Sequence, residues 1–140
     1  MEESKRSPEE VVKVMLERDR FTRWMGLEVE ECRAGYCKLH YQVKDEMLNG
    51  FDIVHGGVLF SASDSALAFV CNVDGNITLA LDASINFIRP AKPGERLTVE
   101  AVEVHRGRTI GVYEIRTTRE NGELVALFRG TAYRTAKVLS

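Results

Sequence analysis

Hydrophobic and polar positions change their period several times along the chain, and each change marks a predicted element. Ser7-Pro8 suits the start of a helix, and the apolar residues that follow recur at helical spacing, so we expect an amphipathic helix over residues 8–19. Three further apolar residues precede Gly26, namely Phe21, Trp24 and Met25. We attribute this aromatic cluster to packing of the helical segment onto the domain.

Segments with strand-like patterns make up most of the remaining chain. Residues 27–32 and 36–43 predict a hairpin across a short loop that contains Gly35. Residues 77–87 carry apolar side chains at every odd position, which is the clearest strand signal in the sequence. Three more strands are predicted over residues 97–105, 109–118 and 123–135.

One long apolar segment interrupts these strands. Residues 58–72 contain no Gly or Pro and are apolar or small on every side, so they predict a helix of about four turns that is buried on most sides. Consecutive strands joined by short turns favour an antiparallel meander, and a curved sheet wrapped around the long helix would cover it. We therefore predict one α+β domain over residues 1–140, with residues 1–25 as an N-terminal helical extension. Its sheet edges invite a partner subunit.

Composition and charge exclude several classes of function. The chain has 140 residues and a net charge of -2, which gives no electrostatic basis for binding nucleic acid. No apolar run reaches the length of a membrane span and the first residues do not resemble a signal peptide, so we expect a cytoplasmic protein with no membrane partner. The cysteines and histidines lack metal-ligand spacing, and we expect no metal. Cys32 and Cys37 could meet across the predicted hairpin, but reduced thiols are the expected state.

Asp64 is the first candidate catalytic residue. It is the only charged residue between Gly57 and Asp74, and no basic residue lies within four positions of it. A carboxylate in apolar surroundings is costly unless it has a partner or a function. A capping or salt-bridging role is the alternative, and the position in the middle of the apolar run disfavours it.

The start of the long helix is the second candidate. The first N–H groups of a helix have no internal partner and carry partial positive charge, so a carbonyl oxygen beside Gly56 and Gly57 would be polarised. Alternatively, the two glycines only let the loop turn into a tightly packed helix. His55 could act as a base or shape the loop. Asn49 could bind a carbonyl or a water, or serve only the Asn49-Gly50 turn.

The spacing of the two candidates constrains how they can cooperate. Asp64 follows Gly56 by eight residues, which corresponds to about 12 Å along a helix axis. One reacting carbonyl cannot touch both groups within one chain. If both serve the same reaction, the site must lie between two subunits.

The segment LNGFDIVHGGVLFSASD, residues 48–64, resembles the hotdog-fold acyl-CoA thioesterases, and among them the PaaI group of phenylacetic acid degradation enzymes. That group carries Asn-Gly, then His-Gly-Gly, then an Asp on the central helix. Residues 87–90, 111–113 and 125–130 are also similar to it, so the resemblance spans nearly all of residues 26–134. It implies a hotdog fold, in which a curved antiparallel sheet wraps one long central helix, and dimers that usually pair into a homotetramer.

The resemblance also implies a role for each candidate residue. Asp64 would be the nucleophile or general base in hydrolysis of an aryl or medium-chain acyl-CoA, with no further cofactor. Gly56 would donate its N–H to the thioester oxygen, assisted by Asn49 and His55 of the same subunit, while Asp64 would come from the facing subunit. One departure concerns a Ser or Thr that helps to hold water in some relatives, because the aligned position here is Ala80.

Basic residues in the turns are candidates for binding the phosphates of the acyl-CoA partner. They are Arg89, Lys92, Arg106 and Arg108, and each could equally be a solvated surface charge. Two other functions stay open. An enoyl-CoA hydratase of the same fold would need His and acid motifs that are absent here. A non-catalytic acyl-CoA-binding module would not need the costly Asp64.

Overall fold

The computed structural model describes residues 6–140, so the first five residues of the predicted extension lie outside the description. Its helices are α1 (Pro8–Arg18), α2 (Arg20–Met25), the single 3-10 turn η1 (Asp45–Met47) and α3 (Gly56–Asn72). Its strands are β1 (Glu28–Arg33), β2 (Tyr36–Gln42), β3 (Asn76–Phe87), β4 (Arg96–Arg106), β5 (Ile110–Thr118) and β6 (Leu124–Val138). The predicted elements and the α+β class are confirmed, with bounds that differ by at most a few residues.

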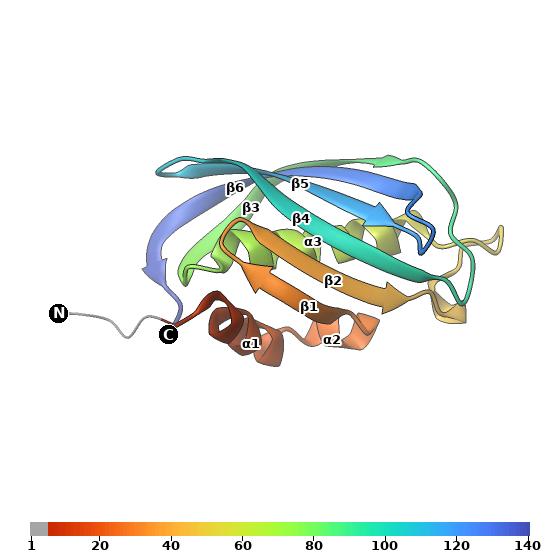
Figure 1. The fold of residues 1–140 in the computed structure, drawn as a ribbon, viewed down its shortest axis with the longest axis horizontal. Helices are drawn as coiled ribbons and strands as arrows, with labels where there is room; N and C mark the ends of the chain where they lie inside the picture. The colour runs from red at the N-terminus through yellow and green to blue at the C-terminus, as the bar shows by residue number, and fades with distance from the viewer. Residues whose placement is uncertain (1–5) are drawn as a thin grey trace.

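The six strands form one antiparallel sheet that curves around α3 (Figure 1). The strand order is β1-β2-β4-β5-β6-β3, so the predicted meander is wrong at one strand. β3 does not lie between β2 and β4; it pairs with β6 at the edge of the sheet. The cause is the connection over residues 88–95. It leaves β3 beside Val125 of β6 and reaches Val43 beyond β2, which carries the chain across to β4.

The core lies between α3 and the concave face of the sheet. Side chains such as Leu39, Val99 and Phe128 are completely buried there. Helix and sheet approach closely at Gly130, where an added Cβ would lie 2.7 Å from the side chain of Leu67. A glycine at this point lets the helix lie against the sheet.

The expectation that α3 is buried on most sides needs one correction. Gly57, Phe60 and Asp64 form a stripe along α3 that is exposed in the single chain, although the ring of Phe60 also packs against Phe128 of β6. The neighbouring edge strand is also exposed, with Leu79 at 59% and Leu81 at 60% of their full accessibility. Strict alternation correctly identified β3 as a strand. Within the described residues of a single chain, however, no other element covers the side chains of Leu79 and Leu81.

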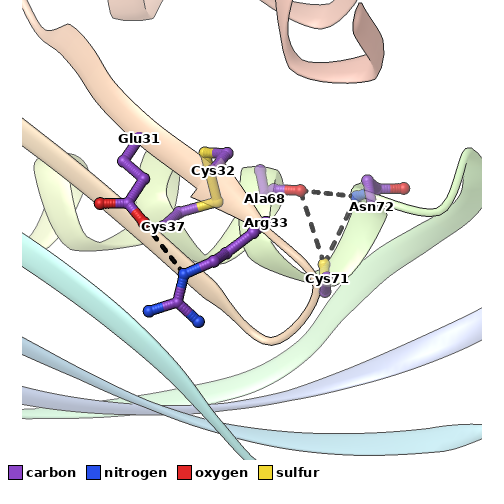
Figure 2. Close-up of a disulfide and its surroundings, with 7 residues drawn as sticks. All are labelled: Glu31, Cys32, Arg33, Cys37, Ala68, Cys71 and Asn72. Atoms are coloured by element: carbon purple, nitrogen blue, oxygen red, sulfur yellow. Dashed lines mark hydrogen bonds and ion pairs between the residues drawn. A yellow bond between two sulfur atoms is a disulfide. The ribbon is translucent and has the colours of Figure 1, made fainter. Parts of the chain in front are cut away.

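Cys32 and Cys37 form a disulfide across the β1–β2 hairpin (Figure 2), so the expectation of reduced thiols is wrong for this pair. The hairpin register places the two residues directly opposite each other, with their Cα atoms 4.2 Å apart. Facing residues on two antiparallel strands alternate between wider and closer Cα separations. Cys32 and Cys37 occupy a position with the closer separation. Cys71 in α3 is a buried free thiol.

None of the helices within residues 6–140 combines the length and the apolar composition needed to cross a membrane. The same residues contain no group of three or more His, Cys, Asp or Glu side chains arranged to hold a metal ion.

Candidate active site

Asn49 organises the loop that precedes α3. Its side-chain Oδ1 accepts hydrogen bonds from the N–H groups of Phe51 (2.8 Å) and Ile53 (3.4 Å). Its backbone closes the same turn, because Asn49 N–H donates to the Ile53 carbonyl and Asp52 N–H donates to the Asn49 carbonyl. The turn role is therefore present. The Asn49 Nδ2 group has no acceptor among the described residues and can donate to a ligand.

His55 is the N-cap of α3, and it shapes the helix start. Its backbone is extended, with φ -65° and ψ 136°, and its Nδ1 accepts a hydrogen bond of 2.8 Å from Gly57 N–H. The backbone N–H of His55 donates to the Met47 carbonyl, which fixes the loop from the other side. Because Nδ1 accepts, the ring carries no proton there. Gly57 N–H is thus already used, and His55 acts on the loop through that bond.

Gly56 is different, because its backbone N–H has no acceptor within residues 6–140. As the first residue of α3 it is one of the N–H groups that a helix leaves unpaired. Gly56 and Asn49 line a cleft of about 410 Å³. The ring of Phe87 lies over Gly56, and a Cβ added at Gly56 would be 3.2 Å from that ring. Phe87 was not among the sequence candidates, although it begins the segment 87–90 that shares the family resemblance.

Arg89 lines the same cleft as Gly56 and Asn49. Its Nη1 donates to the Leu124 carbonyl at 2.7 Å, and its Nε lies 3.7 Å from the carboxylate of Glu123. The side chain is still 43% exposed. The structure therefore brings five predicted site residues to one end of α3: Asn49, His55, Gly56, Gly57 and Arg89.

Asp64 lies on the exposed stripe of α3, and it forms no ion pair with any residue that the structure describes. Partial desolvation raises the pKa of the Asp64 carboxyl above its ordinary value, and the negative charge of Asp19 raises it further. Asp19 lies at the start of α2, which contacts α3 through a 2.8 Å hydrogen bond between Thr22 Oγ1 and Ser65 Oγ. The salt-bridged alternative for Asp64 finds no support here.

The raised pKa of Asp64 predicts an effect on stability. The pKa is higher in the folded than in the unfolded chain, so the ionised carboxylate destabilises the folded state at neutral pH. Asp64→Asn should therefore raise the urea midpoint of unfolding at pH 7. The gain should disappear as pH falls below the ordinary pKa of 3.8, where the wild-type carboxyl is protonated in both states. A variant less stable than the wild type at pH 7 would contradict this.

Arg106 and Arg108 lie at the other end of α3. Arg106 pairs with Asp74, whose carboxylate also accepts from Arg134 at 3.0 Å. Asp74 follows the C-terminal end of α3, a helix of 17 residues that is about 25 Å long, so Arg106 is remote from Gly56 of its own chain. Arg108 is an exposed residue in the turn between β4 and β5. Only another subunit could place these two arginines beside Gly56.

Comparison with known proteins identifies the family. A model of the thioesterase superfamily matches residues 51–126, the segment that contains Gly56, Asp64 and β3. The acyl-coenzyme A thioesterase PaaI of Escherichia coli K12 is 37% identical over 86% of this chain and 86% of that protein.

Solved structures agree with this assignment. The E. coli PaaI protein from the phenylacetic acid degradation operon superposes with a TM-score of 0.93 at 33% identity, over 95% of this chain and 96% of that one. A hypothetical thioesterase of Streptococcus pneumoniae with coenzyme A gives a TM-score of 0.78 at 30% identity, over 81% of this chain and 88% of that one. The resemblance seen in the sequence is thereby confirmed, and the chain belongs to the thioesterase superfamily, with the hotdog fold.

Proposed function

We propose that this chain is an acyl-CoA thioesterase that hydrolyses aryl (phenylacetyl-type) or medium-chain acyl-CoA to the free acid and CoA. One observation carries the proposal: Gly56, whose N–H has no acceptor within residues 6–140, lines a cleft, and the same helix presents on its exposed stripe the carboxylate of Asp64, which has no ion-pair partner among those residues. A carbonyl-polarising donor and a nucleophile or base are the two groups that thioester hydrolysis requires. The relatives named above support the choice of acyl-CoA as substrate.

Each site is proposed to lie between two subunits. Because α3 is one uninterrupted helix, Gly56 and Asp64 of one chain stay about 12 Å apart along its axis. Gly56, Asn49 and His55 would come from one subunit and Asp64 from its partner. The uncovered apolar edge of β3, next to the exposed stripe of α3, supports a homodimer formed through this side of the molecule. Two such dimers would form the tetramer implied by the family resemblance.

The chemistry then follows from the two groups. The thioester oxygen would accept hydrogen bonds from Gly56 N–H and Asn49 Nδ2, which stabilise the oxyanion as it forms. Asp64 would either attack the carbonyl carbon, giving an anhydride and expelling the CoA thiolate, or take a proton from the water that attacks. Hydrolysis of the anhydride by water would release the acid in the first case. Label from ¹⁸O-water found in the Asp64 carboxylate after a single turnover would identify the first route.

A panel of acyl-CoA substrates tests the proposal. Release of free CoA thiol would be measured with phenylacetyl-, benzoyl-, hexanoyl- and acetyl-CoA, and hydration of an enoyl-CoA would be measured in parallel. We expect the aryl or medium-chain thioesters to exceed acetyl-CoA in kcat/KM by about tenfold or more, since an apolar pocket gains from each added methylene. Absence of thiol release from every thioester would overturn the proposal, and hydration of the enoyl-CoA alone would favour the hydratase.

A further inference from the structure

A second groove lies on the other side of the α3 start, between α2 and α3. It has a volume of about 400 Å³, within the range of small-molecule sites. Phe21 and Trp24 of α2 form one wall, and Gly57, Val58 and Ser61 of α3 form the other. The first wall belongs to the N-terminal helical extension, for which the sequence offered no role beyond packing.

The aromatic wall is exposed rather than packed. Met25 is buried, as the packing interpretation requires, but Phe21 is 49% and Trp24 is 77% exposed. That interpretation is therefore wrong for the two aromatic residues. Their ring centroids are 5.8 Å apart, so together they present one apolar surface to the groove. Exposed aromatic surface that lines a groove is a feature of ligand-binding grooves and of protein interfaces.

Hydrogen bonds hold this wall in place next to Asp64. Asp19 caps α2 by accepting from Thr22 N–H at 3.0 Å and from Thr22 Oγ1 at 2.6 Å. The buried Thr22 hydroxyl is in turn 2.8 Å from Ser65 Oγ, and Ser65 is the next residue after Asp64. On the opposite wall, Ser61 precedes Asp64 by three residues, about 4.5 Å along the axis. The groove therefore ends within one helical turn of Asp64.

We propose that this groove receives the acyl group of the thioester hydrolysed at Asp64 of the same subunit, and that Phe21 and Trp24 select aromatic and other bulky apolar acyl groups. The inference rests on the proposed function. Position favours the acyl group over the CoA nucleotide. The groove ends within one helical turn, about 5.4 Å, of Asp64. The long pantetheine arm holds the adenine farther than that from the thioester. The lining is mostly apolar, which also favours the acyl group. Its acidic and basic residues are Lys44, Glu46 and His55.

Trp24 is the only tryptophan in the chain, so its fluorescence reports directly on occupation of the groove. Asp64→Asn protein would be titrated with phenylacetyl-CoA, acetyl-CoA and free CoA, with correction for their absorbance. We expect a saturable change in emission with phenylacetyl-CoA, and a change less than about a fifth as large with the other two, which lack a bulky acyl group. Equal changes with free CoA would place the nucleotide in the groove and overturn the proposal. Absence of any change would overturn it as well.

Substitution of Trp24 gives the kinetic counterpart. Trp24→Ala should lower the ratio of kcat/KM for phenylacetyl-CoA to that for acetyl-CoA by about 10- to 100-fold, whereas Trp24→Phe should keep most of the ratio. Val104→Ala is the matched control, because Val104 is also an exposed apolar residue but lies on β4, outside the groove lining. This variant should leave the ratio unchanged. An unchanged ratio in Trp24→Ala overturns the acyl groove, as does dissociation of its oligomer, which would mark Trp24 as a subunit contact. Hydrolysis by the wild type in the same assay reports separately on the proposed function.

Discussion

Asp64→Asn should lower kcat for phenylacetyl-CoA hydrolysis by roughly 10³-fold, within the range for removal of a general base. Asparagine has nearly the same size as aspartate but can neither attack a thioester nor accept a proton from water. The substitution breaks no ion pair among the described residues, and the side chain reaches solvent in the single chain, so the fold should persist. The rate would be measured as thiol release, with circular dichroism and size-exclusion chromatography to verify the structure.

Asp52→Asn is the matched control for this variant. It makes the same chemical change at an exposed carboxylate in the loop before α3. Asp52 has a positive φ of 60°, a conformation that asparagine also tolerates. Its kcat should stay within about twofold of the wild type, as for most surface substitutions. An Asp64→Asn enzyme that kept more than about a tenth of the wild-type rate would remove Asp64 from the catalytic role.

Gly56→Pro should lower kcat by about 10²- to 10³-fold, because it deletes the one N–H at the start of α3 that has no acceptor among the described residues. Proline is favoured at the first position of a helix, and the residue before proline must be extended. Gly56 occupies that first position, and His55 has the extended backbone that the substitution requires. The donor can therefore be removed while the helix start is kept, and the variant's kcat would be measured on purified folded protein.

Gly56→Ala separates the lost donor from added bulk. Alanine keeps the N–H and adds a Cβ that would lie 3.2 Å from the ring of Phe87. That ring is 57% exposed and can move aside, so this variant should lose much less activity than Gly56→Pro. If the two variants lost equal activity, bulk at Gly56 rather than the N–H would control the rate.

Local patterns were sufficient to predict the elements, because each pattern reports on one segment. The absence of Gly and Pro over residues 58–72 predicted α3, and strict alternation predicted β3. Alternation does not indicate which strand a strand pairs with. The edge position of β3 depends on the path of residues 88–95, which contact both β6 and the end of β2. Contacts of this kind between distant segments carry no local signal.

In the candidate site too, local features could be predicted from the sequence and contacts between distant segments could not. Asn49, His55 and Gly56 are close in sequence, so one loop and one helix start necessarily hold them together. The exposure of Asp64 could not be predicted, because a helix that is apolar on all sides does not show which side its own chain leaves uncovered. Arg106 looked like a free turn residue, but the fold places it beside Asp74 at the far end of α3.

The most direct test of the two-subunit site mixes subunits of the two inactive variants, Asp64→Asn and Gly56→Pro. In a twofold-symmetric dimer, a mixed pair has one site with both substitutions and one site with neither. Random association therefore predicts recovery of about a quarter of the wild-type activity, because half of the dimers are mixed and half of their sites are intact. If differently tagged subunits co-purify as mixed dimers but activity stays at the level of the separate variants, Gly56 and Asp64 do not meet across the interface.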